Sequence, residues 1–334
     1  MTLMKRIGLF MTRGMCTAPM WVGLMSGLVG VCAHANEIWP SKPVTIINPW
    51  AAGGPAEGII RPIAQQLSQR LGQQFLIDTR SGANGTLGAT AVARAKPDGY
   101  TLLFAHVGPI AISPALPTKL SYDPTKDFVA ITQISSSPTV LVVRGDHPAK
   151  SLGELLALAR SQPGKLTYGS VGIGSTTHLA FATLTHQARV DMVHIPYRGS
   201  SLVNTDLLGG QIHAAFVGVA GVRSLIQEGR LRALAVSEAK RSDVLPQVPT
   251  VAETLPGFEM TTWYGLMAPA GTPPEIVNKI YKEVAAILKM PEIAGRMRDN
   301  GVEPEGGTPQ AFAARIRDDL GRWAAAVKAA DVKD

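Results

Sequence analysis

Short apolar runs alternate with helical patterns along the chain, and this alternation constrains the fold more than any other feature of the sequence. In the first series, strand-like runs and helical patterns take turns at residues 44–48, 59–71, 75–77, 86–95 and 100–105. The isoleucines and leucines of the first helical pattern recur at spacings that place them on one helix face. Such a β-α-β-α-β series predicts an α/β fold with a mostly parallel sheet covered by helices.

A second series follows the first. Its expected strands and helices alternate over residues 139–143, 152–160, 166–168, 176–187, 192–195, 201–208, 214–217, 222–228 and 231–236. Three helical segments come next, each with a proline at or near its first turn, at residues 274–288, 291–299 and 309–330. We therefore expect two lobes around a cleft, joined by strands near 137–143 and 261–267. The expected lobes are residues 36–136 with 261–334, and residues 137–260.

Residues 1–35 have the parts of a secretory signal peptide. Three basic residues precede an apolar stretch at 21–31, and the Ala-His-Ala run at 33–35 fits a small-x-small cleavage site. We expect cleavage after residue 35 and a periplasmic protein. A retained N-terminal anchor is the alternative, although the apolar stretch is short for a membrane span.

Both cysteines, Cys16 and Cys32, lie in this segment. Val31 precedes Cys32 where the signals of lipid-modified proteins have a small residue, which disfavours a lipoprotein. The mature chain then forms no disulfide and no thiolate metal site. An ordinary hydrophobic core must stabilise it, and a chain of this length favours two domains.

The charge balance excludes one class of partner. The signal segment contains three of the 32 basic residues and no acidic residue, since the first of the 25 acidic residues is at position 37. Its removal therefore lowers the formal net charge from +7 to +4. The basic residues are scattered, without runs or interleaved aromatics, so nothing supports nucleic-acid binding. A mild positive balance suits an anionic ligand.

The loops after the expected strands of the first series are small and glycine-rich, and ligands of open α/β sheets bind beyond these strand ends. Gly53 and Gly54 follow the first strand, Asn84 follows the second and His106 the third. Glycine lets backbone amides approach a ligand closely, and a following helix N-terminus suits an anion. Each has a plainer alternative: a tight turn, helix capping by Asn84 and a structural role for His106.

Two loops of the second series have similar features. Ser175, Thr176 and Thr177 bring three hydroxyls to the start of an expected helix, which favours carboxylate or phosphate oxygens. Ordinary N-capping is the alternative. Tyr197 and Arg198 precede another expected helix and offer an aromatic plate, a hydroxyl and a charge, although one arginine in a loop is usually solvated.

No enzyme signature is present. The glycines at 172–174 lack the lysine and spacing of a Walker loop, and there is no G-x-S-x-G or H-E-x-x-H motif. Ser175 and His178, three apart on one helix turn, do not place an imidazole as a catalytic triad with Asp206 needs. A zinc site at His178, His186 and His194 lacks dense ligand spacing. We expect no catalytic residue, metal or cofactor.

Many short stretches identify a family that the chain resembles. They include Trp-Pro-Ser-Lys-Pro-Val at 39–44, Pro-Asp-Gly-Tyr-Thr-Leu-Leu at 97–103, His-Ile-Pro-Tyr-Arg-Gly at 194–199 and Pro-Thr-Val-Ala-Glu at 249–253. The chain resembles the Bug family, the TctC-like solute-binding receptors of tripartite tricarboxylate transporters, from residue 39 to about 329. The resemblance implies a two-lobed type II periplasmic-binding-protein fold, a small carboxylate ligand, membrane transporter subunits as partners and a monomer. A ligand sensor for a signalling receptor and an α/β enzyme acting on a small acid are the alternatives.

The resemblance also implies that backbone amides and ordered water at the first glycine loop and the glycine-asparagine loop hold one carboxylate, and that loops of the second lobe complete the site. The expected ligand-binding residues are Ala51, Ala52, Gly53, Gly54, Gly82, Ala83, Asn84, His106, Gly174, Ser175, Thr176, Thr177, His178, Tyr197, Arg198, Gly199 and Ser200. Val217 stands where many relatives have an aspartate that could pair with a ligand ammonium, which weakens the case for an amino-acid ligand.

Overall fold

The computed structural model describes residues 39–50, 55–117 and 119–332. The predicted signal peptide, residues 1–35, lies outside the described residues, and so do the predicted binding residues Ala51, Ala52, Gly53 and Gly54.

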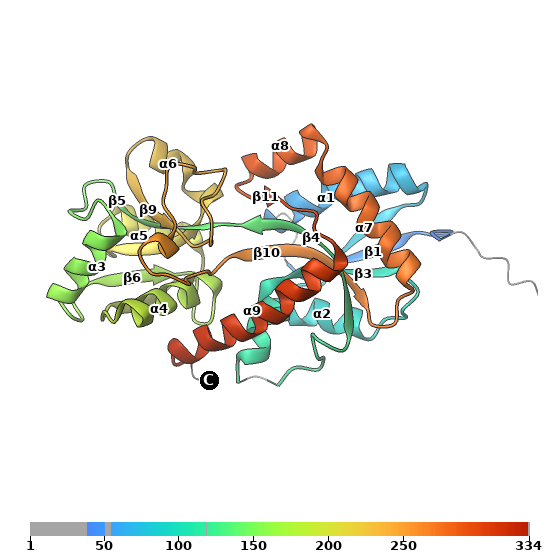
Figure 1. Cartoon of the computed structure of the whole chain (residues 1–334), viewed down its shortest axis with the longest axis horizontal. Helices are drawn as coiled ribbons and strands as arrows, with labels where there is room; N and C mark the ends of the chain where they lie inside the picture. Colours follow the sequence, from blue (N-terminus) through green and yellow to red (C-terminus); the bar gives the residue numbers. More distant parts are fainter. Residues whose placement is uncertain (1–38, 51–54, 118, 333–334) are drawn as a thin grey trace, which may run out of the picture. The chain divides into compact units, whose positions relative to one another are not determined.

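A six-stranded sheet, the first sheet, forms from both ends of the described chain (Figure 1). Its strands, in spatial order, are β11 (Glu303–Pro304), β4 (Phe128–Ser137), β10 (Thr262–Pro269), β3 (Thr101–His106), β1 (Val44–Asn48) and β2 (Phe75–Thr79). β1 pairs in parallel with β2 and β3, whereas β10 runs antiparallel to β3 and β4. We call this sheet and the helices that cover it the first lobe.

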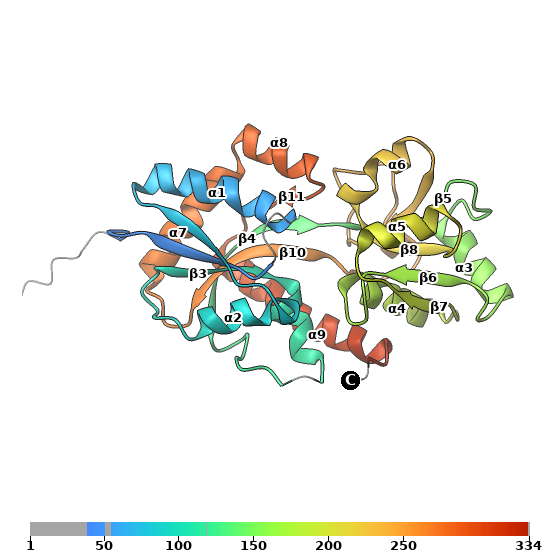
Figure 2. The same cartoon turned by 180° about the vertical axis from the view of Figure 1, so that it is seen from behind.

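Helices cover both faces of the first sheet because its strands are apolar on both faces. Leu102 and Phe104 of β3 belong to one buried cluster, and Leu103 and Ala105 to the other, as the alternation of side chains along a strand requires. The helices on one side are α1 (Pro55–Leu71), α7 (Pro274–Leu288) and α8 (Pro291–Asp299). On the other side lie α2 (Thr86–Ala93) and α9 (Pro309–Ala329), as Figure 2 also shows.

A five-stranded sheet, the second sheet, forms from the middle of the chain. Its strands, in spatial order, are β7 (Val193–Pro196), β6 (Thr167–Ser170), β8 (Ala214–Gly218), β5 (Thr139–Arg144) and β9 (Leu231–Val236). Its helices are α3 (Leu152–Ser161), α4 (Thr176–Ala188), α5 (Ser200–Leu208) and α6 (Arg223–Gln227). β6 is parallel to β7 and β8, and β5 is antiparallel to β8 and β9. We call this part the second lobe.

The two sheets share one topology, and it confirms the predicted α/β class. Each has three adjacent parallel strands, then one antiparallel strand, β10 or β5, and then a further strand, β4 or β9. Both sheets are mixed, because β10 and β5 run antiparallel to the strands beside them. β5 is the first strand of the second sheet after the chain leaves the first sheet, and β10 is the first strand of the first sheet after the chain returns. Each therefore starts at the end of its sheet that faces the other lobe and runs against the neighbouring strands.

The chain passes between the sheets at two neighbouring places. β4 ends at Ser137 and β5 begins at Thr139, while β9 ends at Val236 and β10 begins at Thr262. Thr139 and Ser237 connect these two chain segments by hydrogen bonds. Their hydroxyl oxygens lie 2.8 Å apart, and the Ser237 N–H donates to the Thr139 carbonyl. The predicted lobe limits, at residues 136–137 and 260–261, stay a prediction. Within the described residues, no helix combines the length and apolarity needed to cross a bilayer.

Candidate functional site

A cavity of about 210 Å³ lies where the strand ends of the two lobes meet. The first lobe contributes loops and strands that include the end of β3 and the start of β10, and the second lobe contributes the loop between β6 and α4. The lining residues are Trp50, Asn84, His106, Gly108, Ile112, Val171, Gly174, Ser175, Thr176 and Tyr264. Five of the residues predicted from the sequence are among them: Asn84, His106, Gly174, Ser175 and Thr176.

Three aromatic rings form the wall on the first lobe. The His106 ring lies 5.1 Å from that of Trp50 and 4.7 Å from that of Tyr264, between centroids. His106 Nδ1 accepts the N–H of Gly108 at 3.0 Å, so the neutral ring carries its hydrogen on Nε2. Burial lowers the pKa of His106 to about 3. His106 can therefore donate a hydrogen bond to a ligand, but it brings no positive charge.

Asn84 is held by an unusual backbone turn. It lies in a short helical turn, η1 (Ala83–Gly85), with φ of 53° and ψ of 33°, in the left-handed region that asparagine tolerates better than most residues. Asn84 does not cap α2, because the N-cap position is Gly85 and no side chain caps the helix. The capping alternative is therefore wrong here. Within the part of the chain that the structure describes, the Asn84 amide forms one long contact, 3.4 Å, with Ser113 Oγ.

In the β6–α4 loop, most side-chain hydroxyls form hydrogen bonds within the loop and the first turn of α4. Ser175 caps α4 by accepting the His178 N–H at 3.3 Å, and its hydroxyl donates to the Gly172 carbonyl. Thr177 Oγ1 accepts the Val171 N–H at 3.1 Å. N-capping by Ser175 is thus correct. The Thr176 hydroxyl, which lines the cavity, makes no hydrogen bond to another described residue.

The other predicted residues lie elsewhere. Thr177 and His178 are buried outside the cavity lining, and Gly82 and Ala83 precede Asn84 without lining it. Tyr197 donates from its hydroxyl to Asp206 at 2.7 Å, and the positions of Tyr197, Arg198, Gly199 and Ser200 are outside the lining as well. Burial and the nearby Asp206 raise the pKa of Tyr197 to about 12.

Sequence reasoning missed Trp50, Gly108, Ile112, Val171 and Tyr264. The sequence position of Trp50 could have identified it, because it comes two residues after β1 and directly before the first glycine loop. No local pattern identifies Tyr264, because it lies inside β10 and is brought to the cavity by the pairing of β10 with β3.

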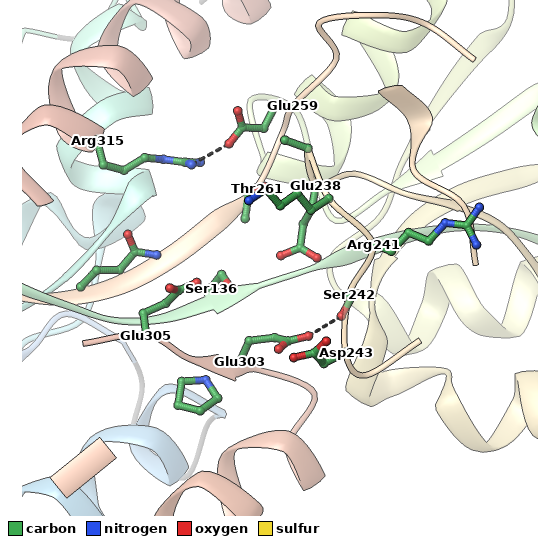
Figure 3. A pocket seen from close by; sticks show the side chains of 14 residues that line it. Ser136, Glu238, Arg241, Ser242, Asp243, Glu259, Thr261, Glu303, Glu305 and Arg315 are labelled. Atoms are coloured by element: carbon green, nitrogen blue, oxygen red, sulfur yellow. Dashed lines mark hydrogen bonds and ion pairs between the residues drawn. The ribbon is translucent and has the colours of Figure 1, made fainter. Parts of the chain in front are cut away.

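A second cavity, of about 520 Å³, is lined by many charged residues, among which the carboxylates outnumber the basic Lys240, Arg241 and Arg315 (Figure 3). Glu238, Glu303 and Glu305 line it from the two lobes, and Glu238 points into it. Glu303 accepts a hydrogen bond from Ser242 at 2.6 Å. Burial, with the charges of Glu303 and Glu305, raises the pKa of Glu238 to about 8. Crowded carboxyl groups disfavour an anionic ligand, so this cavity does not suit a carboxylate.

Replacement of Glu238 by glutamine is expected to stabilise the protein at alkaline pH. Glu238 has a raised pKa when folded, about 8, so the unfolded chain loses this proton first as pH rises from about 4.5. Stability conferred by the protonated carboxyl is therefore present below pH 4.5 and is lost as pH rises to 8. Glu238→Gln should raise the free energy of unfolding by about 1–2 kcal/mol at pH 8, a value reduced for solvent screening of a partly exposed group, and should not change it at pH 4.

Thermal unfolding at both pH values measures this effect. Glu228→Gln is a matched control at an exposed side chain, which forms a long ion pair with Arg230, 3.6 Å, and should change little at either pH. Equal shifts for the two variants at pH 8 would contradict the expectation.

Comparisons with known proteins identify the family. The family model described as "Tripartite tricarboxylate transporter family receptor" matches residues 59–332. The chain belongs to this family. The receptor is 36% identical over 293 residues to the UPF0065 protein in the tcbD-tcbE intergenic region of Pseudomonas sp. (strain P51), with 87% of each chain covered.

Two solved structures resemble the receptor in sequence and in fold. R. palustris Rpa4515 with adipate is 35% identical, with a TM-score of 0.74 and coverage of 88% of the receptor and 98% of that chain. MatC (Rpa3494) from Rhodopseudomonas palustris with bound malate is 33% identical, with a TM-score of 0.70 and coverage of 86% and 99%. These matches confirm the predicted family and the predicted two-lobed fold. Among the described residues, no three His, Cys, Asp or Glu side chains gather as metal ligands.

Proposed function

We propose that the receptor binds a small carboxylate in the 210 Å³ cavity and delivers it to the membrane subunits of a tripartite tricarboxylate-type transporter. Family membership and the adipate and malate of Rpa4515 and MatC support this proposal. We also propose that the chain is exported with cleavage after residue 35, acts in the periplasm as a monomer and does not transform its ligand.

The observation that carries the proposal is the donor-rich lining of the cavity. Trp50 Nε1 is buried and has no hydrogen-bond partner among the described residues, and the Asn84 amide forms a single long contact there, to Ser113. The neutral His106 ring carries an N–H on Nε2, and Thr176 has a hydroxyl in the first turn of α4, at its positive end. None of the described lining residues is an Asp or a Glu. Several donors without a competing carboxylate suit an anion that accepts hydrogen bonds.

The size of the cavity limits the ligand. A cavity of about 210 Å³ is smaller than the roughly 300–1,000 Å³ pockets that hold drug-sized molecules, so it suits a small ligand. The loop of Gly53 and Gly54 stays part of the proposed site on sequence grounds, as a source of backbone amides next to Trp50.

Titration calorimetry on protein freed of co-purified ligand tests the proposal. A panel of small carboxylates, including adipate and malate, is compared with the uncharged amides of the same acids. At least one carboxylate is expected to bind, and its amide is expected to bind at least tenfold more weakly, because a charge-assisted hydrogen bond contributes about 1.5–3 kcal/mol. Binding of no carboxylate in the panel would contradict the function.

Asn84→Asp is expected to weaken carboxylate binding by at least tenfold, because it replaces an amide donor with a negative charge. Aspartate tolerates the same left-handed backbone, so the fold should be unaffected. Asn300→Asp adds the same charge at the exposed C-terminal end of α8, outside the cavity lining, and should bind normally. Equal affinities of the two variants would place the ligand away from Asn84.

A further inference from the structure

Two histidines of the second lobe lie face to face beside the loop that lines the cavity. The imidazole of His178, on α4, stacks on that of His194, on β7, with ring centroids 3.9 Å apart and planes 14° apart. The stack continues through Tyr168 and Phe181, with centroid separations of 5.0 and 4.0 Å. Neither histidine lines the cavity.

Both histidines hold the β6–α4 loop by hydrogen bonds. His178 Nδ1 accepts the N–H of Gly174 at 3.1 Å. His194 Nε2 lies 2.7 Å from Ser170 Oγ. That hydroxyl donates to the Gly172 carbonyl at 3.1 Å and accepts the Gly172 N–H at 3.2 Å, so His194 Nε2 is the donor to Ser170. Gly172 and Gly174 have φ of 126° and 71°, backbone conformations that glycine adopts readily and other residues resist. Gly174 lines the cavity, so the histidines set the shape of its wall.

This arrangement needs a neutral His178 and disfavours a charge on His194, which is stacked against it. A proton on His178 Nδ1 would place a donor against the Gly174 N–H, and two charged rings 3.9 Å apart would repel each other. Burial lowers the pKa of both histidines, and the nearby His178 contributes to the value of about 4 for His194.

The surrounding elements supply no charge that would offset a protonated ring. Tyr168, on β6, is neutral because burial raises its pKa to about 12. β8 has no titratable residue. On α9, which contacts α4, Arg315 and Arg322 pair with Asp319 and Glu259. Among the described residues, no carboxylate contributes to the pKa of His178 or His194.

We propose that His178 and His194 are positioning residues, which hold the β6–α4 loop in its ligand-binding shape only while both rings are neutral, so that acidification weakens ligand binding. The link to ligand binding rests on the proposed function. Simple attraction between a protonated histidine and a carboxylate predicts the opposite sign, namely tighter binding at low pH. The direction of the pH effect therefore separates positioning from direct ligand contact.

The pH window follows from the two states of the loop. When the loop is released, the rings regain an ordinary pKa near 6.5, whereas in the closed loop the pKa of His194 is about 4. The loop is then fully held above pH 6.5 and is released progressively as pH falls toward 4. At pH 5 the closed loop should be at least tenfold less favoured than at pH 7.5.

Amide hydrogen exchange of residues 171–176 in the ligand-free full chain tests the loop itself. Exchange, corrected for intrinsic rates, is expected to be at least tenfold faster at pH 5 than at pH 7.5. His178→Ala should remove protection at both pH values. His178→Asn offers an amide oxygen near the position of Nδ1, so it should restore protection and make it independent of pH. His186→Asn, an exposed change on the same helix, should behave like the native protein.

Calorimetry with adipate as the probe gives the second measurement. The dissociation constant of the native protein should rise from pH 7.5 to pH 5.5, by up to about tenfold, since affinity follows the fraction of protein with a closed loop, and that of His178→Asn should rise much less. Protection of residues 171–176 that is equal at both pH values, or unchanged in His178→Ala, would overturn the proposal. Tighter adipate binding by the native protein at pH 5.5, with His178→Asn lacking that gain, would overturn it too. If the exchange results hold but no carboxylate binds, the proposed function fails and the positioning of the loop stands.

Discussion

Asp319→Asn is expected to lower the free energy of unfolding by about 3 kcal/mol, because it breaks a buried charge network and leaves two guanidinium groups undercompensated. The Asp319 side chain is completely buried on α9. Its carboxylate accepts hydrogen bonds from Trp263 Nε1 at 2.7 Å, Arg315 Nε at 2.8 Å and Arg322 Nη1 at 2.5 Å. Through Trp263, this network connects α9 to β10, the strand that also contains Tyr264 of the cavity.

An asparagine cannot satisfy the same partners. Its amide nitrogen is a donor, so it would face a guanidinium or indole donor where the second carboxylate oxygen now accepts. Glu259 would be left as the acidic partner of both arginines, at 2.6 Å from Arg315 and 2.9 Å from Arg322. Since the arginines are about one quarter exposed, water offsets part of the loss, which places the estimate at the low end of about 3–5 kcal/mol for breaking a buried pair.

Chemical denaturation of Asp319→Asn and of Asp318→Asn makes the matched comparison. Asp318 is the next residue along α9 and is exposed, so the same chemical change there should alter stability by less than about 0.5 kcal/mol. A loss below about 1 kcal/mol for Asp319→Asn would mean that the network contributes little to stability.

Gly265→Ala is expected to destabilise the protein by about 2–3 kcal/mol, as overpacking of a filled core does. A Cβ at Gly265 would lie 2.3 Å from Phe312 Cζ and 3.0 Å from the Thr132 carbonyl oxygen. Phe312 cannot move away easily, because it is buried and packs edge-on against Trp263 at 5.0 Å. Relief of the clash would displace β10 itself, and with it Tyr264 in the cavity wall.

The same substitution at another glycine should have the opposite sign. A Cβ at Gly321, on the exposed side of α9, would meet no atom within 4 Å. Gly321→Ala is therefore expected to stabilise the protein by about 0.5–1 kcal/mol, because glycine is a poor helix former. Thermal unfolding of the two variants measures both effects. A stable Gly265→Ala variant would mean that the packing between β10 and α9 can adjust without cost.

The sequence by itself determined the kinds of elements and the family. The strands Val44–Asn48 and Leu231–Val236 and the helices Pro274–Leu288 and Pro291–Asp299 have the bounds that their patterns predict. Apolar periodicity carries this information because one face of each element must be buried. Ser175 likewise caps α4 because capping depends on residues only three apart.

Tertiary structure alone decided which residues share the cavity. Arg198 and Trp50 both follow strands, yet only Trp50 lines it, because the pairing of strands selects which loops meet. The first part of β4 was not predicted, since its buried Thr132 and Ser135 interrupt the apolar pattern. The stacking of His178 on His194 joins residues of two elements, α4 and β7. Such contacts depend on distance in space, and a pattern along one segment carries no information about it.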